Sequence, residues 1–269
     1  IKQTDELMAL MISVSGIRGI FGTDLTPENI ARFTAAYGSW LKGGSVVLGR
    51  DSRVTGALCE EIVAATLNSV GCDVIRVGIV PTPTVAMGVL KHQAAGGIII
   101  TASHNPAEWN ALKLLNSKSE FLDALEGKEV INLAESGSLD YKMYDQIGEN
   151  RMDEQLVDFH IQQILDLPYI DQQVIAEAGF SVALDAVNGA GSHVVPQLLE
   201  ALGVQTIHKV HCEPNGLFPH NPEPLPEHLG DICELTKASD AHIGFVTDPD
   251  ADRLAIVDEN GRLFGEEYT

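Results

Sequence analysis

The same order of elements occurs twice in this sequence, and the repeat limits which folds the chain can adopt. In each half a helix ends at a glycine and a strand follows: residues 67–71 and 74–77 in the first half, 199–203 and 206–210 in the second. Strands that alternate with helices are typical of α/β layers with mainly parallel pairing. We therefore predict an α/β protein with two tandem, similar three-layer α/β/α domains and mixed, largely parallel sheets.

The repeat extends to two strands that lead into polar loops. Residues 96–100 are an apolar strand that continues into Thr-Ala-Ser-His-Asn-Pro at 101–106. Residues 241–246 continue through Thr247 into Asp-Pro-Asp-Ala-Asp-Arg at 248–253. Sheets of the α/β kind bind ligands beyond the carboxyl ends of their strands. Two such loops on equivalent strands predict an active-site cleft between the two domains.

The predicted domains divide the chain at residue 152, after a polar and acidic stretch. Residues 1–152 form domain I with the serine loop, residues 153–258 form domain II with the aspartate loop, and residues 259–269 begin a truncated third domain. A hairpin is predicted around residues 259–261. Residues 1–10 lack the basic start and apolar core of a signal peptide. Because the sequence lacks an initial methionine and stops soon after the predicted hairpin, we expect a fragment of a longer chain.

Composition argues against two classes of partner. With 17 basic and 38 acidic residues the net charge is −21, which disfavours a nucleic-acid or anionic-membrane surface. No apolar segment reaches the roughly 18 residues of a membrane span. The four cysteines include no C-x-x-C pair. These features favour a reduced, cytoplasmic protein whose phosphate ligands meet a local basic cluster or a metal.

Three carboxylates alternate in the aspartate loop, at Asp248, Asp250 and Asp252. Like charges this close favour a bound cation, and hard oxygen ligands favour Mg²⁺ or Ca²⁺. A solvated acidic turn is the plain alternative, although the apolar strand before the loop favours the metal site. An EF-hand loop is disfavoured because Arg253 occupies the sixth position, where that loop needs glycine.

Ser103 is the candidate nucleophile of the other loop. A Ser-His-acid hydrolase is disfavoured, because Ser103 and His104 would point to opposite sides of an extended backbone and no G-x-S-x-G turn is present. A phosphorylated Ser103 makes better sense, since a divalent ion on the three aspartates could bind one of its oxygens. Arg18, Lys113 and Arg253 would balance the remaining charge.

Two further stretches contain polar side chains of interest. Residues 15–22 form a glycine-punctuated loop that turns around Arg18. His208, His211 and Cys212 suggest a metal cluster, but one strand does not bring three neighbouring side chains to one side. We therefore assign these three residues no ligand role.

Three motifs together resemble the α-D-phosphohexomutase family, which includes phosphoglucomutase, phosphomannomutase and phosphoglucosamine mutase. They are residues 101–106 with Lys113, residues 248–253 and residues 16–19, and the similarity also covers 49–53 and 218–224. The resemblance implies that Ser103 is the phosphoserine and shares a bound Mg²⁺ with Asp248, Asp250 and Asp252. It also implies active-site roles for Arg18, Lys113 and Arg253, with Lys113 as a candidate general base and His104 beside the serine.

The family's reaction moves a phosphoryl group between the 6- and 1-hydroxyls of a hexose. The resemblance therefore implies an intramolecular phosphotransferase that acts on a mannose, glucose or glucosamine phosphate, with hexose 1,6-bisphosphate as intermediate and activator. Family members have four domains, and this sequence matches the first two and the start of the third. Because sugar recognition lies largely in the later domains, we expect residues 1–269 to fold and bind Mg²⁺ but not to turn over.

Two alternatives stay open. Residues 244–250 mimic the strand and D-x-D of haloacid-dehalogenase-like phosphatases, in which Asp248 would carry an acyl phosphate. A non-enzymatic, Ca²⁺-stabilised interaction module would carry no phosphate on Ser103. Hydroxylamine separates the two enzymes, because it cleaves an acyl phosphate and leaves phosphoserine intact.

Overall fold

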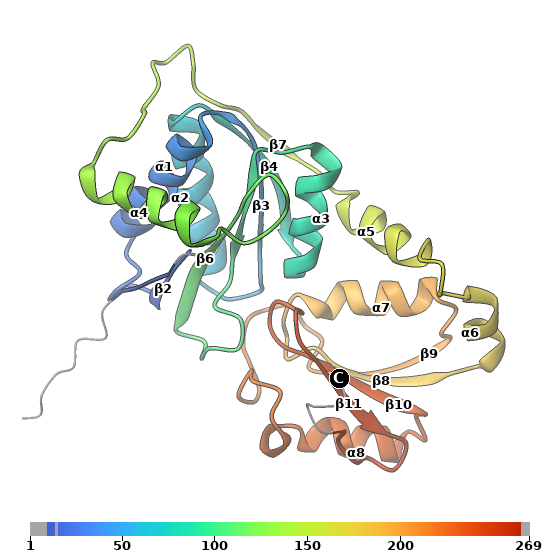
Figure 1. The fold of residues 1–269 in the computed structure, drawn as a ribbon. Helices are drawn as coiled ribbons and strands as arrows, with labels where there is room; N and C mark the ends of the chain where they lie inside the picture. The colour runs from blue at the N-terminus through green and yellow to red at the C-terminus, as the bar shows by residue number, and fades with distance from the viewer. Residues whose placement is uncertain (1–9, 14–15, 265–269) are drawn as a thin grey trace, which may run out of the picture.

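The computed structural model describes residues 10–13 and 16–264, which fold as two units along the chain (Figure 1). The strands are β1 (Met11–Ser13), β2 (Gly16–Ile20), β3 (Gly44–Arg50), β4 (Cys72–Ile79), β5 (Gly96–Ile100), β6 (Trp109–Leu115), β7 (Asn150–Met152), β8 (Ser181–Asp185), β9 (Thr206–Val210), β10 (Ile243–Thr247) and β11 (Leu254–Asp258). The helices are α1 (Pro27–Leu41), α2 (Gly56–Ser69), α3 (Thr82–His92), α4 (Ala124–Ser136), α5 (Leu156–Leu165), α6 (Gln172–Ala178), α7 (Gly191–Ala201) and α8 (Gly230–Ala238), with the 3-10 turn η1 (Pro226–His228).

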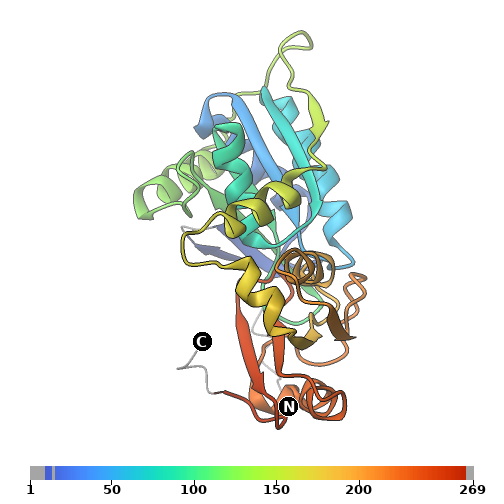
Figure 2. The ribbon, with the colours of Figure 1, turned by 90° about the vertical axis from the view of Figure 1, so that its right-hand side faces the viewer.

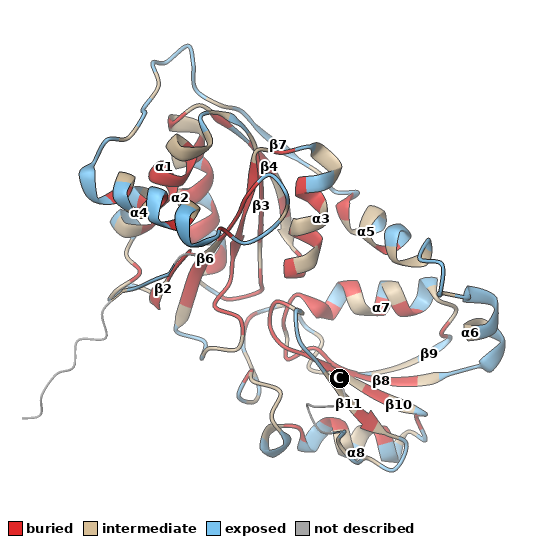
Figure 3. Ribbon diagram, in the orientation of Figure 1, coloured by how far each residue is buried: buried red, intermediate tan, exposed pale blue. Residues whose placement is uncertain are grey.

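The first unit is a three-layer structure on a seven-stranded mixed sheet, in the order β1-β2-β6-β5-β3-β4-β7. The pairs among β5, β3, β4 and β7 are parallel, and those among β1, β2, β6 and β5 are antiparallel. Helices α1, α2 and α4 bury one face of the sheet, while α3 and α5 bury the other. Figure 3 shows the buried residues concentrated on the strands and on the inward sides of these helices.

The second unit is built in the same way on a four-stranded sheet, in the order β11-β10-β8-β9. Alternate residues of β8 serve the two faces: Val182 packs in the cluster that includes Leu199 of α7, and Ala183 packs in the cluster that includes Ile232 of α8. This alternation is what a parallel strand buried on both sides requires. The predicted α/β/α class is therefore confirmed for both units.

The strand orders also confirm the predicted repeat. The order β6-β5-β3-β4 in the first unit matches β11-β10-β8-β9 in the second, with the same parallel core and the same antiparallel return strand. The strands before the two polar loops, β5 and β10, hold equivalent places. Helix α5 packs against α3 of the first unit and α7 of the second, and Figure 2 shows it in yellow between the two.

The sequence-based prediction of a loop over residues 15–22 is wrong for most of that stretch. Gly16–Ile20 forms β2, which pairs antiparallel with β6. Gly16 has φ +141°, and a Cβ there would overlap the carbonyl oxygen of Leu112. The glycine therefore permits close strand pairing instead of marking a loop.

Near the end of the described chain the predicted hairpin is present: the chain turns back after β11, and the Phe264 N–H donates to the Ile256 carbonyl over 2.9 Å. The Asp258 N–H donates to the Arg262 carbonyl over 2.8 Å, and Val257 and Leu263 form a single bridge. The predicted start of a third domain falls partly on residues 265–269, and the N-terminal features concern residues 1–9; both lie outside the described residues. Within the described ranges, no helix combines the length and apolar character needed to cross a membrane.

Tyr37 fastens α1 to the sheet below it. Its fully buried hydroxyl donates to the Leu115 carbonyl over 2.7 Å and lies 3.2 Å from the Gly97 carbonyl. Gly96 makes the room, because a Cβ there would overlap the tyrosine oxygen. A buried polar group that loses its partner destabilises the fold.

We expect Tyr37→Phe to lower the free energy of unfolding by about 1–2 kcal/mol, because it leaves buried carbonyls without this donor. Urea unfolding followed by circular dichroism measures the change. Tyr144→Phe is the control, since Tyr144 is 86% exposed and its hydroxyl can bond water in either state. Equal stability of Tyr37→Phe and the wild type would contradict this account of how α1 is held.

Candidate active site

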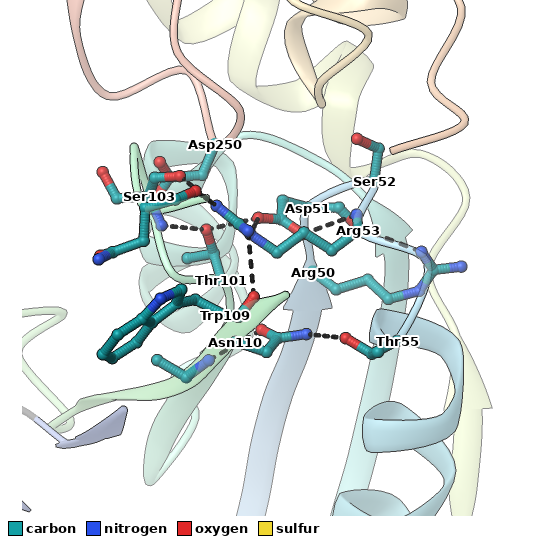
Figure 4. A network of polar contacts seen from close by, with 12 residues as sticks. Arg50, Asp51, Ser52, Arg53, Thr55, Thr101, Ser103, Trp109, Asn110 and Asp250 are labelled. Carbon is teal, nitrogen blue, oxygen red and sulfur yellow. Dashed lines mark hydrogen bonds and ion pairs between the residues drawn. The ribbon is translucent and has the colours of Figure 1, made fainter. Parts of the chain in front are cut away.

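The serine loop and the aspartate loop meet where the two units join. Ser103 Oγ donates to Asp248 Oδ2 over 3.0 Å, and both residues are buried. The two residues follow β5 and β10, the equivalent strands of the repeat. Figure 4 shows Ser103 beside Asp250, which lies in the same acidic loop. The structure thus brings the two predicted loops into one site.

Ser103 adopts a backbone conformation that few non-glycine residues take. Its φ is +51°, and its N–H donates to Thr101 Oγ1 over 2.9 Å. Such left-handed residues store strain of order 1–3 kcal/mol, so the surrounding contacts must hold the turn. One result is that Ser103 Oγ lies 3.3 Å from His104 Nδ1. The expectation that these side chains point apart is wrong, because it assumed an extended backbone.

Arg53 supports the serine loop through hydrogen bonds to its main chain. Arg53 is buried, and its guanidinium donates to four carbonyl oxygens. The four carbonyls, at 2.6–3.0 Å, belong to Ser103, Asn105, Pro106 and Trp109. Figure 4 shows Arg53 between Asp51 and the loop. The main chain around Ser103 is therefore fixed by one side chain.

Asp51 is the buried counterion of Arg53. Its Oδ2 accepts from Arg53 Nε over 3.0 Å and from Thr101 Oγ1 over 2.7 Å, and its Oδ1 accepts from the Arg53 N–H over 2.9 Å. Burial raises the pKa of Asp51 to about 6, although the guanidinium and these hydrogen bonds oppose the rise. A buried charge pair is stable only when its remaining polar atoms are also bonded, and this pair meets that condition.

Lys113 and Thr82 of the first unit contact the acidic loop. Lys113 Nζ lies 2.7 Å from Asp250 Oδ2 and 3.2 Å from Asp252 Oδ2. Thr82 donates to Asp250 twice, from Oγ1 to Oδ2 over 2.6 Å and from its N–H to the carbonyl over 2.9 Å. The lysine thus neutralises part of the acidic loop and lies across the junction between the units.

The three aspartates have the oxygens that a cation site needs. One carboxylate oxygen from each of Asp248, Asp250 and Asp252 lies within 4.8 Å of the others. Asp250 Oδ1 is buried and has no hydrogen-bond partner among the described residues. Burial and the neighbouring carboxylates raise the pKa of Asp248. An unpartnered carboxylate oxygen among like charges is costly unless a cation binds there.

The two predicted arginines contact residues next to the serine hydroxyl and the acidic loop. Arg18 Nη1 donates to Asn105 Oδ1 over 2.9 Å, next to the serine loop. Arg253 donates its backbone N–H to Asp248 Oδ1 over 3.1 Å, while its guanidinium is 3.6 Å from Glu223 and 44% exposed. A cavity of about 640 Å³ opens here, lined on one side by Asp252 and Arg253 and on the other by residues 223–226. Arg253 therefore lies at the wall of a cavity beside the site.

Two family models match most of the chain. Residues 10–139 match the phosphoglucomutase/phosphomannomutase alpha/beta/alpha domain I, and residues 158–261 match alpha/beta/alpha domain II. The chain belongs to the α-D-phosphohexomutase family. The two matches place the serine loop in the first phosphohexomutase domain and the aspartate loop in the second. The exact boundary at residue 152 stays a prediction.

Relatives and a solved structure agree with membership of the phosphohexomutase family. The chain is 36% identical over 259 residues to a Methanopyrus kandleri protein named "Probable phosphoglucosamine mutase", covering 96% of this chain and 56% of that one. It is 37% identical over 268 residues to the phosphoglucomutase/phosphomannomutase of Thermococcus kodakarensis, covering 97% and 58%. A phosphoglucomutase/phosphomannomutase family protein from Burkholderia thailandensis has a TM-score of 0.81 at 27% identity, covering 94% and 56%. The chain therefore spans a little over half the length of these phosphohexomutases.

Sequence reasoning missed three residues that build this phosphohexomutase site: Asp51, Arg53 and Thr82. Asp51 and Arg53 directly follow the buried strand β3, and a charged pair two positions apart at such a strand end was the available signal. Thr82 gave no comparable signal, because it opens α3 as an ordinary polar residue after Pro81.

We expect Arg53→Met to lower the free energy of unfolding by at least about 3 kcal/mol, because Asp51 would remain as an unpaired buried charge. Urea unfolding measures this loss. The stability of Arg53→Lys should lie between those of the wild type and Arg53→Met, since one ammonium does not reach all four carbonyls. Arg262→Met serves as control at an exposed arginine. A stability loss below that of the control would show that Arg53 does not support the loop.

Proposed function

We propose that this chain carries the phosphoryl-transfer half of a phosphohexomutase in which Ser103 is phosphorylated. The enzyme interconverts hexose 6-phosphate and hexose 1-phosphate through hexose 1,6-bisphosphate. The observation that supports this most directly is the buried contact between Ser103 Oγ and Asp248 Oδ2, which joins the serine of one domain to the acidic loop of the next. The names of the relatives make glucosamine, glucose and mannose phosphates the candidate substrates.

The transfer step needs a proton acceptor near the serine. When the phosphoryl group leaves Ser103, its bond to Oγ breaks, a bond to a sugar hydroxyl oxygen forms, the sugar hydroxyl gives up its proton and Oγ takes one up. The reverse transfer removes the proton from Oγ and returns one to the sugar oxygen. His104 Nδ1 is 3.3 Å from Oγ, and burial together with Arg253 and Arg18 lowers the pKa of His104. A neutral imidazole exchanges a proton readily near pH 7. We assign this exchange at Ser103 to His104.

Lys113 is better suited to charge balance than to proton transfer. Burial opposes its charge, but Asp250 and Asp252 outweigh burial and raise the pKa of Lys113. An ammonium is not a base, so the role of general base implied by the resemblance requires Lys113 first to lose a proton, which its contacts with the two carboxylates oppose. Arg18, held by Asn105, adds positive charge beside the serine loop.

The acidic loop is suited to Mg²⁺ on the chemistry of its donors. Mg²⁺ takes oxygen ligands, and the unpartnered, buried Asp250 Oδ1 is one that the protein leaves available. We propose Asp248, Asp250 and Asp252 as ligands, together with an oxygen of phosphorylated Ser103. When bound, the ion would offset charge on the phosphoryl oxygens during transfer.

We expect incubation with glucose 1,6-bisphosphate and Mg²⁺ to place one phosphoryl group on Ser103, detected by peptide mass mapping and stable to hydroxylamine. Ser103→Ala should carry none. Ser119→Ala is the matched control, since Ser119 also has a positive φ but donates to the Ala86 carbonyl and not to a carboxylate of the acidic loop. A hydroxylamine-labile phosphate on Asp248 would instead support the phosphatase alternative.

The same incubation with a hexose phosphate should yield no sustained turnover, because residues 1–269 span only part of the length of the relatives.

For the metal, we expect Asp250→Asn to weaken Mg²⁺ binding at least about tenfold in isothermal titration, because a charged ligand is lost. Asp258→Asn is the control, since Asp258 accepts backbone N–H groups after β11 and lies outside the acidic triplet. Lys113→Met should make folding more dependent on Mg²⁺, because the ammonium no longer neutralises Asp250. Equal Mg²⁺ affinity in Asp250→Asn and the wild type would remove the acidic loop as the metal site.

A further inference from the structure

A second cluster of potential metal ligands lies in the second unit, apart from the acidic loop. It combines Asp185 at the end of β8, His211 just after β9 and His220 in the proline-rich connection to α8. One potential ligand atom from each residue lies within 4.8 Å of the other two. Sequence reasoning grouped His211 with His208 and Cys212 and dismissed them. The fold instead joins His211 to residues from two other segments.

The contact between Asp185 and His220 leaves room for either a proton or a metal ion between the two side chains. His220 Nδ1 lies 2.8 Å from the Asn221 carbonyl oxygen, so Nδ1 carries the hydrogen of that bond. In the neutral ring Nε2 then holds a lone pair, and it lies 3.1 Å from Asp185 Oδ2. Two lone pairs that face each other at this distance need a proton or a metal ion between them. Asp185 is fully buried, which makes the unbridged arrangement more costly.

The outer contacts of the cluster match those of imidazole ligands. His211 Nε2 lies 2.8 Å from Asp231 Oδ2, and the His211 and His220 rings meet edge to face with centroids 5.5 Å apart. Asp185 Oδ1 accepts the Val187 N–H over 2.8 Å. Metal-binding histidines commonly donate their second nitrogen to a carboxylate or carbonyl, and bound carboxylates are themselves hydrogen-bonded. Each member of the cluster thus has an outer partner that orients it.

We propose that Asp185, His211 and His220 form a zinc site that is separate from the acidic loop. Two imidazole nitrogens and one carboxylate oxygen suit Zn²⁺, whereas Mg²⁺ prefers a set of oxygens alone. Three protein ligands leave a fourth tetrahedral position for water. The histidine side chains are 19% and 14% exposed, so an ion can reach the site from solvent.

Zinc here would fasten the connection between β9 and α8 to the end of β8. That connection touches the support of the serine loop, because the Phe218 ring lies 5.0 Å from the Arg53 guanidinium carbon. Gly216 packs so closely on Ser52 that a Cβ would overlap its carbonyl oxygen. The zinc site would therefore stabilise the surface of the second unit that covers Arg53.

The test uses the untagged chain, stripped with a chelator and titrated calorimetrically with Zn²⁺ in excess Mg²⁺. We expect one Zn²⁺ per chain, a higher melting temperature, and visible d–d absorption when Co²⁺ replaces Zn²⁺. His211→Asn and His220→Asn should each weaken Zn²⁺ binding by at least about 100-fold, since losing even an outer partner costs about 10- to 100-fold. His208→Asn is the matched control on β9, outside the cluster, and should bind as the wild type does.

Three results would overturn the proposal. They are no Zn²⁺ bound by the wild type, wild-type Zn²⁺ affinity in both His211→Asn and His220→Asn, or a loss of Zn²⁺ affinity in His208→Asn as large as in those two variants. The first of these would mean that a proton bridges Asp185 and His220. Melting of each variant in chelator, compared with the wild type in chelator, separates loss of a ligand from failure to fold. Asp250→Asn should lose Mg²⁺ binding and keep Zn²⁺ binding, so failure of one metal site does not count against the other.

Discussion

The site depends on one buried guanidinium. The guanidinium N–H groups of Arg53 donate hydrogen bonds to Asp51 and to four carbonyl oxygens of the loop that contains Ser103 (Figure 4). With those carbonyls turned toward Arg53, the strained turn at Ser103 is held and its hydroxyl is left to meet Asp248. A buried cation is tolerable only with such complete pairing, so the loop and the arginine stabilise each other.

The duplicated framework explains why the two loops meet. Ser103 and Asp248 follow equivalent strands, and a second pair of equivalent loops also touches, where Ser52 Oγ after β3 donates to the Asn188 carbonyl after β8 over 2.7 Å. The two sheets therefore approach each other by the same edge, at the carboxyl ends of their parallel strands. This is the edge at which α/β sheets bind ligands, and here each unit supplies one of the two polar loops that meet there.

The strands, the repeat and the meeting of the loops could be predicted, because apolar runs and glycines mark strand and helix ends. The role of Arg53 could not, since its partners are main-chain carbonyls that any sequence provides. The contact of His104 with Ser103 could not either, because nothing in the sequence marks a serine with positive φ. At Gly16 the signal was ambiguous: the same glycine that suggests a loop permits the close pairing of β2 with β6.

The charges at the site set the final constraint. Ser103 contacts Asp248, one of three carboxylates that lie together, and Lys113 is the ammonium that contacts the other two. Phosphorylation would add about −1.5 to −2 charges in a buried place, more than that one ammonium offsets. The chain as a whole carries −21, so no general positive field helps, and the balance has to be local. Phosphorylation and cation binding at this junction must therefore strengthen each other, because each lowers the electrostatic cost of the other.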